Sequence, residues 1–248
     1  MESKNKPIIT IITVVFNGEK YLEETINSVI SQTYENIEYI VIDGGSTDGT
    51  VDIIKKYDSQ IDCWVSEHDE GIYDAMNKGI GLATGDWVNF MNAGDLFYNE
   101  NILESIHSKL KGIFNYGHTL QFDSTGHTKE VLASDKLRKR RMPYCHQSLF
   151  VSGAYLKRNM YDLSYKIASD YNQYIAAKYR GEKFNLLNIC ICKFRVGGIS
   201  QQKKYQSQMS KEYYNSLRHY DSFSALFIFF VKKLKQYFSY YKGFKWLL

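Results

Sequence analysis

The stretch that decides the fold is residues 67–95, EHDEGIYDAMNKGIGLATGDWVNFMNAGD. Its first half predicts a short helix after Gly71. On that helix Asp74, Asn77 and Lys78 follow i, i+3, i+4 spacing and therefore share one face. A lysine and a carboxylate on one face, backed by glycine, suit a phosphate group. An ordinary surface helix is the alternative interpretation.

The second half of this stretch predicts a buried strand over residues 87–91. A polar cluster, Asn92, Ala93, Gly94 and Asp95, follows the strand directly. In an open α/β sheet, ligands bind at the carboxyl ends of the strands. The cluster therefore suits a phosphate with a divalent cation, although these residues alone also fit a simple turn.

Strands and helices alternate three times on the N-terminal side of this cluster. Runs rich in β-branched residues predict strands, and apolar residues at helical spacing predict the helices between them. The alternation is typical of βαβ units on a parallel sheet and indicates an α/β fold. The predicted strands cover 8–16, 37–42 and 61–65, and the predicted helices cover 19–32 and 48–57.

The loop at 43–50, DGGSTDGT, follows the second predicted strand. Its glycines permit tight turns and close backbone approach, and Asp43 stands where it can accept hydrogen bonds from a base or ribose. The loop matches neither a GxGxxG fingerprint nor a P-loop. A capped strand-to-helix turn is the alternative.

Composition narrows the class of protein. With 248 residues the chain can bury one large domain, and a formal net charge of +4 is too small to indicate nucleic-acid binding. The N-terminus has no signal-peptide pattern, and the four cysteines lack zinc-site spacing. We therefore expect reduced thiols in a cytoplasmic protein.

The C-terminal half ends in a basic and apolar region. Residues 136–141, KLRKRR, carry five positive charges in six positions. They form either a solvated loop or a contact with anionic lipid or a lipid-linked diphosphate. Residues 222–248 interleave aromatic and basic side chains around an apolar run too short to span a bilayer. This pattern predicts an interfacial helix on an anionic membrane; packing on the core or in a homodimer is the alternative.

Taken together, the motifs resemble those of family 2 glycosyltransferases of the GT-A fold, and most closely the bacterial exopolysaccharide, O-antigen and colanic-acid-type branch. The resemblance implies a mixed, mainly parallel central sheet flanked by helices. It places a glycosyltransferase domain at 1–200, with a nucleotide-binding half at 1–98 and an acceptor half at 99–200, before a helical extension at 201–248. The matching motifs are TVVFNG (13–18), DGGSTDGT (43–50), residues 69–95, CHQSLF (145–150), SDYN (169–172) and VGGIS (196–200).

The resemblance also implies roles for single residues. The residues it assigns to the nucleotide-sugar, with Asp43 on the base, are Thr13, Val15, Asn17, Asp43, Ser46, Asp48, Gly71, Asp74, Asn77, Lys78, Asn92, Ala93 and Gly94. The family's acidic DxD-type motif falls on residues 92–95, where only Asp95 keeps its carboxylate. That carboxylate, diphosphate oxygens and water can complete an octahedral Mg²⁺ or Mn²⁺ site. The glycine-rich segment 196–200 is expected to close over the donor.

On the acceptor side the family register makes Asp170 the catalytic base, because an attacking hydroxyl must lose a proton to a nearby carboxylate. It makes His146 and Gln147 part of the site wall. Without the family, Asp170 reads as a helix cap and His146 as a structural histidine.

These expectations describe an inverting glycosyltransferase. It would move a hexose or N-acetylhexosamine from a nucleotide diphosphate, most often UDP, onto a glycan or polyprenyl-diphosphate-linked acceptor at the inner face of the cell membrane. One alternative is a catalytically silent sugar-nucleotide-binding subunit, which the reduced acidic motif favours. The other is a nucleotidyltransferase, which would need a basic loop after the first strand where residues 16–19 read FNGE.

Overall fold

The computed structural model describes residues 6–198 and 202–241. In this part of the chain, nine strands form one mixed sheet in the order β3-β2-β1-β4-β8-β6-β9-β5, with β7 paired to β6. The strands are β1 Ile9–Val15, β2 Ile37–Asp43, β3 Cys63–Ser66, β4 Trp87–Phe90, β5 Leu96–Phe97, β6 Phe114–Phe122, β7 Thr128–Val131, β8 Leu149–Ser152 and β9 Phe184–Arg195. The α-helices are α1 Leu22–Ile30, α2 Thr50–Lys56, α3 Ile72–Leu82, α4 Ile102–Ile106, α5 Gly153–Arg158, α6 Ser169–Tyr179, α7 Gln206–Arg218 and α8 Ser222–Tyr241.

The first four strands run parallel, as the βαβ pattern predicts. β1 pairs in parallel with β2 on one side and with β4 on the other, and β2 pairs in parallel with β3. β8 then joins β4 antiparallel, which makes the sheet mixed. Because β1, β2 and β4 point the same way, their last residues meet at one edge of the sheet, which we call the carboxyl edge.

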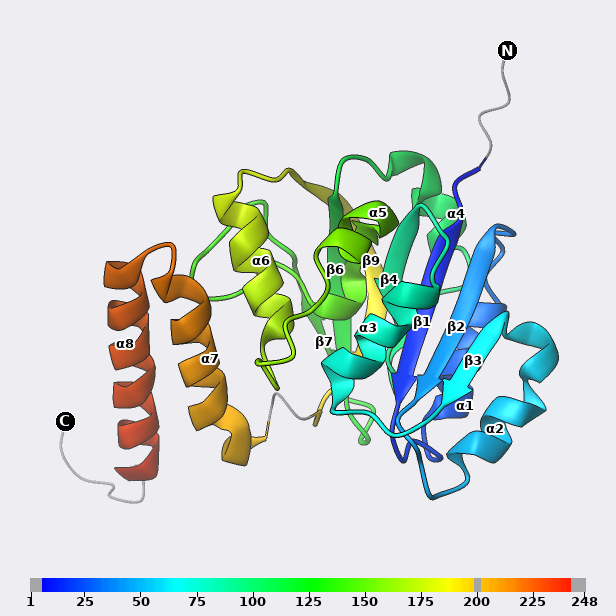
Figure 1. The fold of residues 1–248 in the computed structure, drawn as a ribbon, viewed down its shortest axis with the longest axis horizontal. Helices are drawn as coiled ribbons and strands as arrows, with labels where there is room; N and C mark the ends of the chain where they lie inside the picture. Colours follow the sequence, from blue (N-terminus) through cyan, green and yellow to red (C-terminus); the bar gives the residue numbers. More distant parts are fainter. Residues whose placement is uncertain (1–5, 199–201, 242–248) are drawn as a thin grey trace, which may run out of the picture.

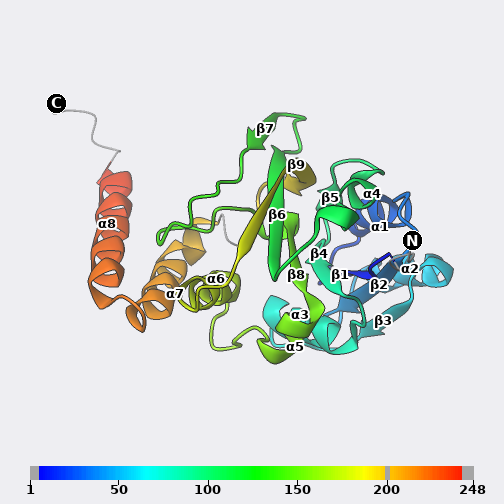
Figure 2. The same ribbon diagram turned by 90° about the horizontal axis from the view of Figure 1, so that it is seen from above.

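β1 is fully buried because both faces of the sheet are covered. Side chains alternate across a strand, so Ile12 and Val14 join the core under α3, while Ile11 and Val15 join the core under α1. In Figure 2 α3 and α5 lie on one face of the sheet, and α1 and α4 lie on the other. The continuous β-branched run therefore serves a central, doubly covered strand.

The C-terminal helices stack outward from one end of the sheet. In Figure 1 α6, α7 and α8 follow one another, with α8 outermost. The expected helical extension is therefore present up to Tyr241. Residues 199–201, which belong to the predicted closing segment and its exit, and residues 242–248 lie outside the described part of the chain.

Candidate active site

Two loops join at the carboxyl edge to form one wall. The Asn17 amide donates to Ser46 Oγ at 2.7 Å, and Asn17 Oδ1 accepts from the Thr47 amide at 2.9 Å. Asn17 adopts a φ of 49°, a left-handed conformation that asparagine tolerates better than most residues. The segment after β1 is thus fastened to the loop after β2.

Asp43 is completely buried at the end of β2. Its Oδ2 accepts from the Ser46 amide at 3.0 Å and from Ser66 Oγ at 2.7 Å, while Oδ1 accepts from Ser46 Oγ. The sequence predicts a carboxylate that stands free for a base or ribose. In the structure it orders its own loop, and contact with a base stays a prediction.

Three other predicted nucleotide residues also support the edge from within. Thr13 is buried and its Oγ1 donates to the Met91 carbonyl at 2.8 Å, which ties β1 to the end of β4. Val15 packs in the core under α1. Asp48 Oδ1 accepts from the Thr50 amide at 3.0 Å at the start of α2. These residues shape the edge, and a direct contact with a ligand stays a prediction for each.

Asp95 lies at the carboxyl edge after β4 with 5% of its surface exposed. One oxygen accepts from the Arg195 amide at 2.9 Å, and the other accepts from Gln147 Nε2 at 2.8 Å. Burial raises the pKa of this carboxyl to about 7, against the two hydrogen bonds that lower it. The structure therefore brings Asp95 and Gln147 together, while the metal contact predicted for Asp95 and the wall role predicted for Gln147 stay predictions.

Arg195, which sequence reasoning missed, closes this corner of the edge. Its guanidinium lies 4.5 Å from the ring centroids of Tyr21 and Phe122, and its Nε donates to the Gly94 carbonyl at 3.2 Å. Gly94 has a φ of 99°, which suits glycine. The sequence offers one sign of this role, because Arg195 directly precedes the quoted segment VGGIS.

The edge offers little to a free cation. The described residues hold no group of three His, Cys, Asp or Glu side chains arranged for a metal. Asn92 Oδ1, however, is buried at the same turn without a hydrogen-bond partner, and Asp95 is three residues away. These two residues could offer at most a few oxygen ligands, so a divalent cation would need a diphosphate to bring the others.

Asp170 stands half-buried at the start of α6. Its Oδ1 lies 3.0 Å from the Tyr73 hydroxyl and 2.7 Å from the Tyr171 amide. The Tyr73 hydroxyl also lies 2.9 Å from the Ile167 carbonyl, so it links α3 to the segment before α6. Asp170 is thereby held in place while part of the residue remains exposed, and its role as a catalytic base stays a prediction.

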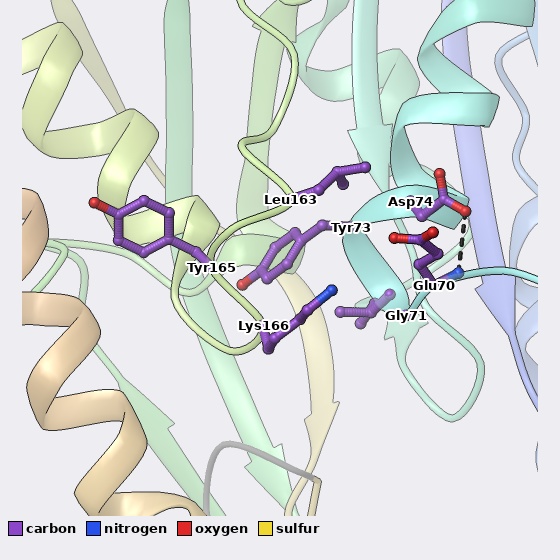
Figure 3. Close-up of a pocket in the computed structure, with 8 residues that line it drawn as sticks. Glu70, Gly71, Tyr73, Asp74, Leu163, Tyr165 and Lys166 are labelled. Carbon is purple, nitrogen blue, oxygen red and sulfur yellow. Dashed lines mark hydrogen bonds between the residues drawn. The ribbon is translucent and has the colours of Figure 1, made fainter.

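Figure 3 shows where Tyr73 sits. A shallow pocket separates the first turn of α3 from the loop that precedes α6, and the ring of Tyr73 lies between Leu163 and Lys166. Gly71 begins this turn with a φ of 122°. Tyr73 falls within the quoted stretch 67–95. Its contact with Asp170 could not be predicted from the sequence, because the two residues lie far apart along the chain.

His146 belongs to the same network. Its Nε2 lies 2.7 Å from the Tyr161 hydroxyl, and its ring stacks on Phe90 with centroids 5.3 Å apart. Burial lowers the pKa of His146, so the neutral imidazole is favoured. The Tyr161 ring is 5.2 Å from the Tyr73 ring, which connects His146 to the surroundings of Asp170.

The predicted polar face of α3 is engaged by the protein itself. Asn77 Nδ2 donates to the Tyr161 carbonyl, and Asn77 Oδ1 accepts from the Tyr161 amide, both at 2.9 Å. Lys78 pairs with Glu67 at 2.8 Å and with Asp74 at 3.5 Å. Asn77 thus orients Tyr161, and the contacts predicted between this face and a diphosphate stay predictions.

Chemically, the arrangement combines an accessible carboxylate at Asp170 with a glycine-containing polar edge around Asp95. The first can take a proton from a hydroxyl, and the second can receive an anionic group together with a cation. Such a pair fits group transfer from an anionic leaving group to an alcohol.

Comparisons with known proteins identify the enzyme class. An uncharacterized glycosyltransferase of Mycobacterium tuberculosis is 30% identical over 212 residues, covering 80% of this chain and 79% of that protein. A PGL/p-HBAD biosynthesis glycosyltransferase of Mycobacterium bovis is 29% identical over 174 residues, covering 67% and 68%.

Solved structures show the same fold. TarS of Staphylococcus aureus in complex with UDP has a TM-score of 0.66 at 18% identity, covering 90% of this chain and 69% of the TarS chain. The mannosyltransferase PcManGT of Pyrobaculum calidifontis, in complex with GDP-Man and Mn²⁺, has a TM-score of 0.64 at 15% identity, covering 92% and 74%. The expected GT-A type of fold is confirmed.

A family model described as glycosyl transferase family 2 matches residues 10–231, which include the carboxyl edge, Asp170 and the start of α8. The expected enzyme class is therefore confirmed, and the chain belongs to glycosyl transferase family 2.

Proposed function

We propose that this protein is an inverting glycosyltransferase that transfers a hexose or N-acetylhexosamine from a UDP-linked donor to a hydroxyl of a surface polysaccharide precursor. The observation that carries the proposal is the placement of Asp170, which is accessible and held by Tyr73. A silent binding subunit would have no need for a carboxylate positioned in this way.

The proposed donor site is the carboxyl edge. Its support comes from the joined loops after β1 and β2 and from the polar turn at residues 92–95. Solved neighbours were crystallised with UDP, UDP-GlcNAc or GDP-Man, which favours a nucleotide-sugar. UDP is our choice of carrier, as the family resemblance implies.

In the proposed reaction the acceptor oxygen forms a bond to the anomeric carbon as the bond from that carbon to the diphosphate oxygen breaks. Asp170 accepts the hydroxyl proton, and UDP leaves with the bonding electron pair. Attack from the face opposite the diphosphate inverts the configuration at the anomeric carbon. His146 and Tyr161 would wall the site beside the sugar.

Asp95 and Asn92 Oδ1 would hold a Mg²⁺ or Mn²⁺ ion together with the donor diphosphate. When bound, the cation neutralises charge on the leaving diphosphate. The Asp95 carboxyl, with its pKa near 7, would ionise fully on taking up the cation. Cation and donor binding should therefore reinforce each other.

We further propose that α8 and the loop at 138–141 dock on an anionic phospholipid surface. Five apolar side chains of α8 follow helical spacing and are 49–83% exposed: Phe223, Leu226, Phe227, Phe230 and Leu234. Beside them lies a hollow lined by Arg138, Lys139, Arg140 and Arg141, with the Arg140 guanidinium 5.3 Å from the Phe227 ring centroid. Cations next to an apolar stripe match phosphate headgroups above acyl chains.

Within the described residues no helix is long and apolar enough to cross a membrane. Docking would therefore be peripheral, on the cytoplasmic face of the cell membrane, where an acceptor carried on a polyprenyl diphosphate would be within reach. A second copy of this chain covering the apolar stripe of α8 is the rival occupant, and it would appear as a concentration-dependent dimer.

The test of the donor site is calorimetric titration of UDP into the wild-type protein and Asp95→Ala, each with and without Mn²⁺. We expect the cation to strengthen UDP binding to the wild type and to have little effect on the variant. Asp52→Ala, which removes an exposed carboxylate on α2, serves as the matched control. Absence of UDP binding under every condition would contradict the proposed donor.

A further inference from the structure

Glu212 is a buried carboxylate that the proposed reaction does not use. It lies on α7 with 7% of its surface exposed. Its Oε2 accepts from the amides of Ile167 and Ala168 at 3.0 and 2.8 Å, and its Oε1 accepts from the amide of Lys166 at 3.1 Å. Three consecutive backbone N–H groups thus converge on one side chain, an arrangement that binds anions in proteins.

These three amides immediately precede the helix that carries Asp170. α6 begins at Ser169, and its N-cap residue, Ala168, has no side chain able to cap the helix. Glu212, on another helix, accepts from the N–H group of this N-cap residue and from the two N–H groups before it. Its carboxylate therefore lies beside the N-terminal end of α6, where the helix dipole favours a negative charge.

The same segment is held from its other side by Tyr73. The Ile167 carbonyl lies 2.9 Å from the Tyr73 hydroxyl, which is also 3.0 Å from Asp170 Oδ1. The N–H group of Ile167 meets Glu212 while its C=O group meets Tyr73. Ile167 lies two positions before the first residue of α6, the helix that carries Asp170. Side chains distant in the sequence therefore fix both backbone polar groups of Ile167.

We infer that Glu212 is a positioning residue for the catalytic base, so that the C-terminal extension is part of the catalytic unit. This inference rests on the proposed role of Asp170. Without the carboxylate of Glu212, the buried amide of Ala168 and the partly buried amides of Lys166 and Ile167 lose their acceptor. The start of α6 would then relax toward other conformations. Displacement of a catalytic group by about 1 Å can lower a rate about 100-fold, even when the change is remote from the chemistry.

The test measures two quantities: kcat, from the rate at which UDP is released during turnover of a UDP-sugar, and the dissociation constant of UDP. Glu212→Gln keeps the shape but turns an NH₂ group toward the amides. We expect kcat to fall about 10- to 100-fold while UDP affinity changes less than about twofold. Asp221→Asn is the matched control, because it removes a carboxylate from the same extension without touching residues 166–168; it should keep kcat.

Two readouts separate positioning from general loss of structure. In Glu212→Ala, formate should restore part of kcat by filling the amide nest, whereas chloride at equal ionic strength should not. In an Asp170→Asn background, Glu212→Gln should cost little further rate, because residues that act as a unit are non-additive.

Full kcat in Glu212→Gln, or a rate loss of the same size with and without Asp170, would overturn the inference. Unchanged turnover in Asp170→Asn alone would instead overturn the proposed function, so the two failures are distinguishable. If Glu212→Ala does not fold, Glu212→Gln carries the test through the kcat and UDP measurements.

Discussion

At the carboxyl edge, Asp43 and Asp95 are buried and their oxygens accept hydrogen bonds from nearby loops. At the start of α6, Asp170 is half-buried. Tyr73 on α3 contacts its carboxylate, and Glu212 on α7 binds the amides that precede its helix. The carboxylates of the edge thus mainly order the protein itself. The α6 start carries the carboxylate that we propose as the catalytic base, and its geometry depends on contacts between distant elements.

The largest effect should follow from removing the carboxylate of Asp170. If the comparison is right, Asp170→Asn lowers kcat by about 10²- to 10⁴-fold, because general-base catalysis is lost, and leaves UDP binding at the edge nearly unchanged. Steady-state UDP release and calorimetry measure the two quantities. Asp162→Asn, which alters an exposed carboxylate in the preceding loop, is the control.

A second experiment probes the burial of Asp95 at the edge. Its folded-state pKa of about 7 exceeds the ordinary value of 3.8. A carboxyl with a raised pKa contributes stability that is complete below the unfolded-state value and is lost as pH rises through about 7. The free energy of unfolding of the wild type, relative to Asp95→Asn, should fall by about 2–3 kcal/mol between pH 5 and pH 8.

Urea unfolding at several pH values checks this difference. Asp52→Asn, on the exposed surface of α2, should give a curve parallel to that of the wild type. If the free energy of unfolding of Asp95→Asn also runs parallel to that of the wild type across this pH range, burial does not raise the pKa of Asp95. The contrast between the carboxyl edge and the start of α6 would then weaken.

The smallest effect should come from the proposed docking surface, which consists of α8 and the loop at 138–141. Replacing Arg140 and Arg141 by alanine should reduce binding to vesicles containing phosphatidylglycerol by about 2 kcal/mol, since each cation near an anionic surface contributes about 1 kcal/mol. UDP affinity should not change. The control variant replaces Lys55 and Lys56 on α2, at the opposite end of the molecule (Figure 1). Equal vesicle binding with dimerisation at higher concentration would favour a second copy over lipid.

The parts of the fold that follow from local pattern were predictable. The β-branched run at 8–16 gave a central strand, and the break at Asn17 and Gly18 marks its end. The polar turn at 92–95 lies at the carboxyl edge, as its position after a buried strand indicates. The start of α6 at Ser169 was also visible, because polar residues there precede apolar residues at helical spacing.

The partners of the site residues were not predictable from one sequence. Asp43 turns inward because Ser66, on the neighbouring strand β3, and the amides of its own loop reach it. Tyr73 lies 97 positions from Asp170 along the chain, and no local pattern encodes that contact. Whether a side chain near a strand end faces a ligand or orders a loop depends on such long-range contacts.

In the reaction that we propose, Asp170 supports a single direct displacement at the anomeric carbon. The most direct measurement is proton NMR of the first product formed from an α-linked UDP-sugar, recorded before mutarotation if the acceptor is water. We expect a β-configured product. An α-configured product would contradict it, because retention of configuration requires a different mechanism from the one assigned to Asp170.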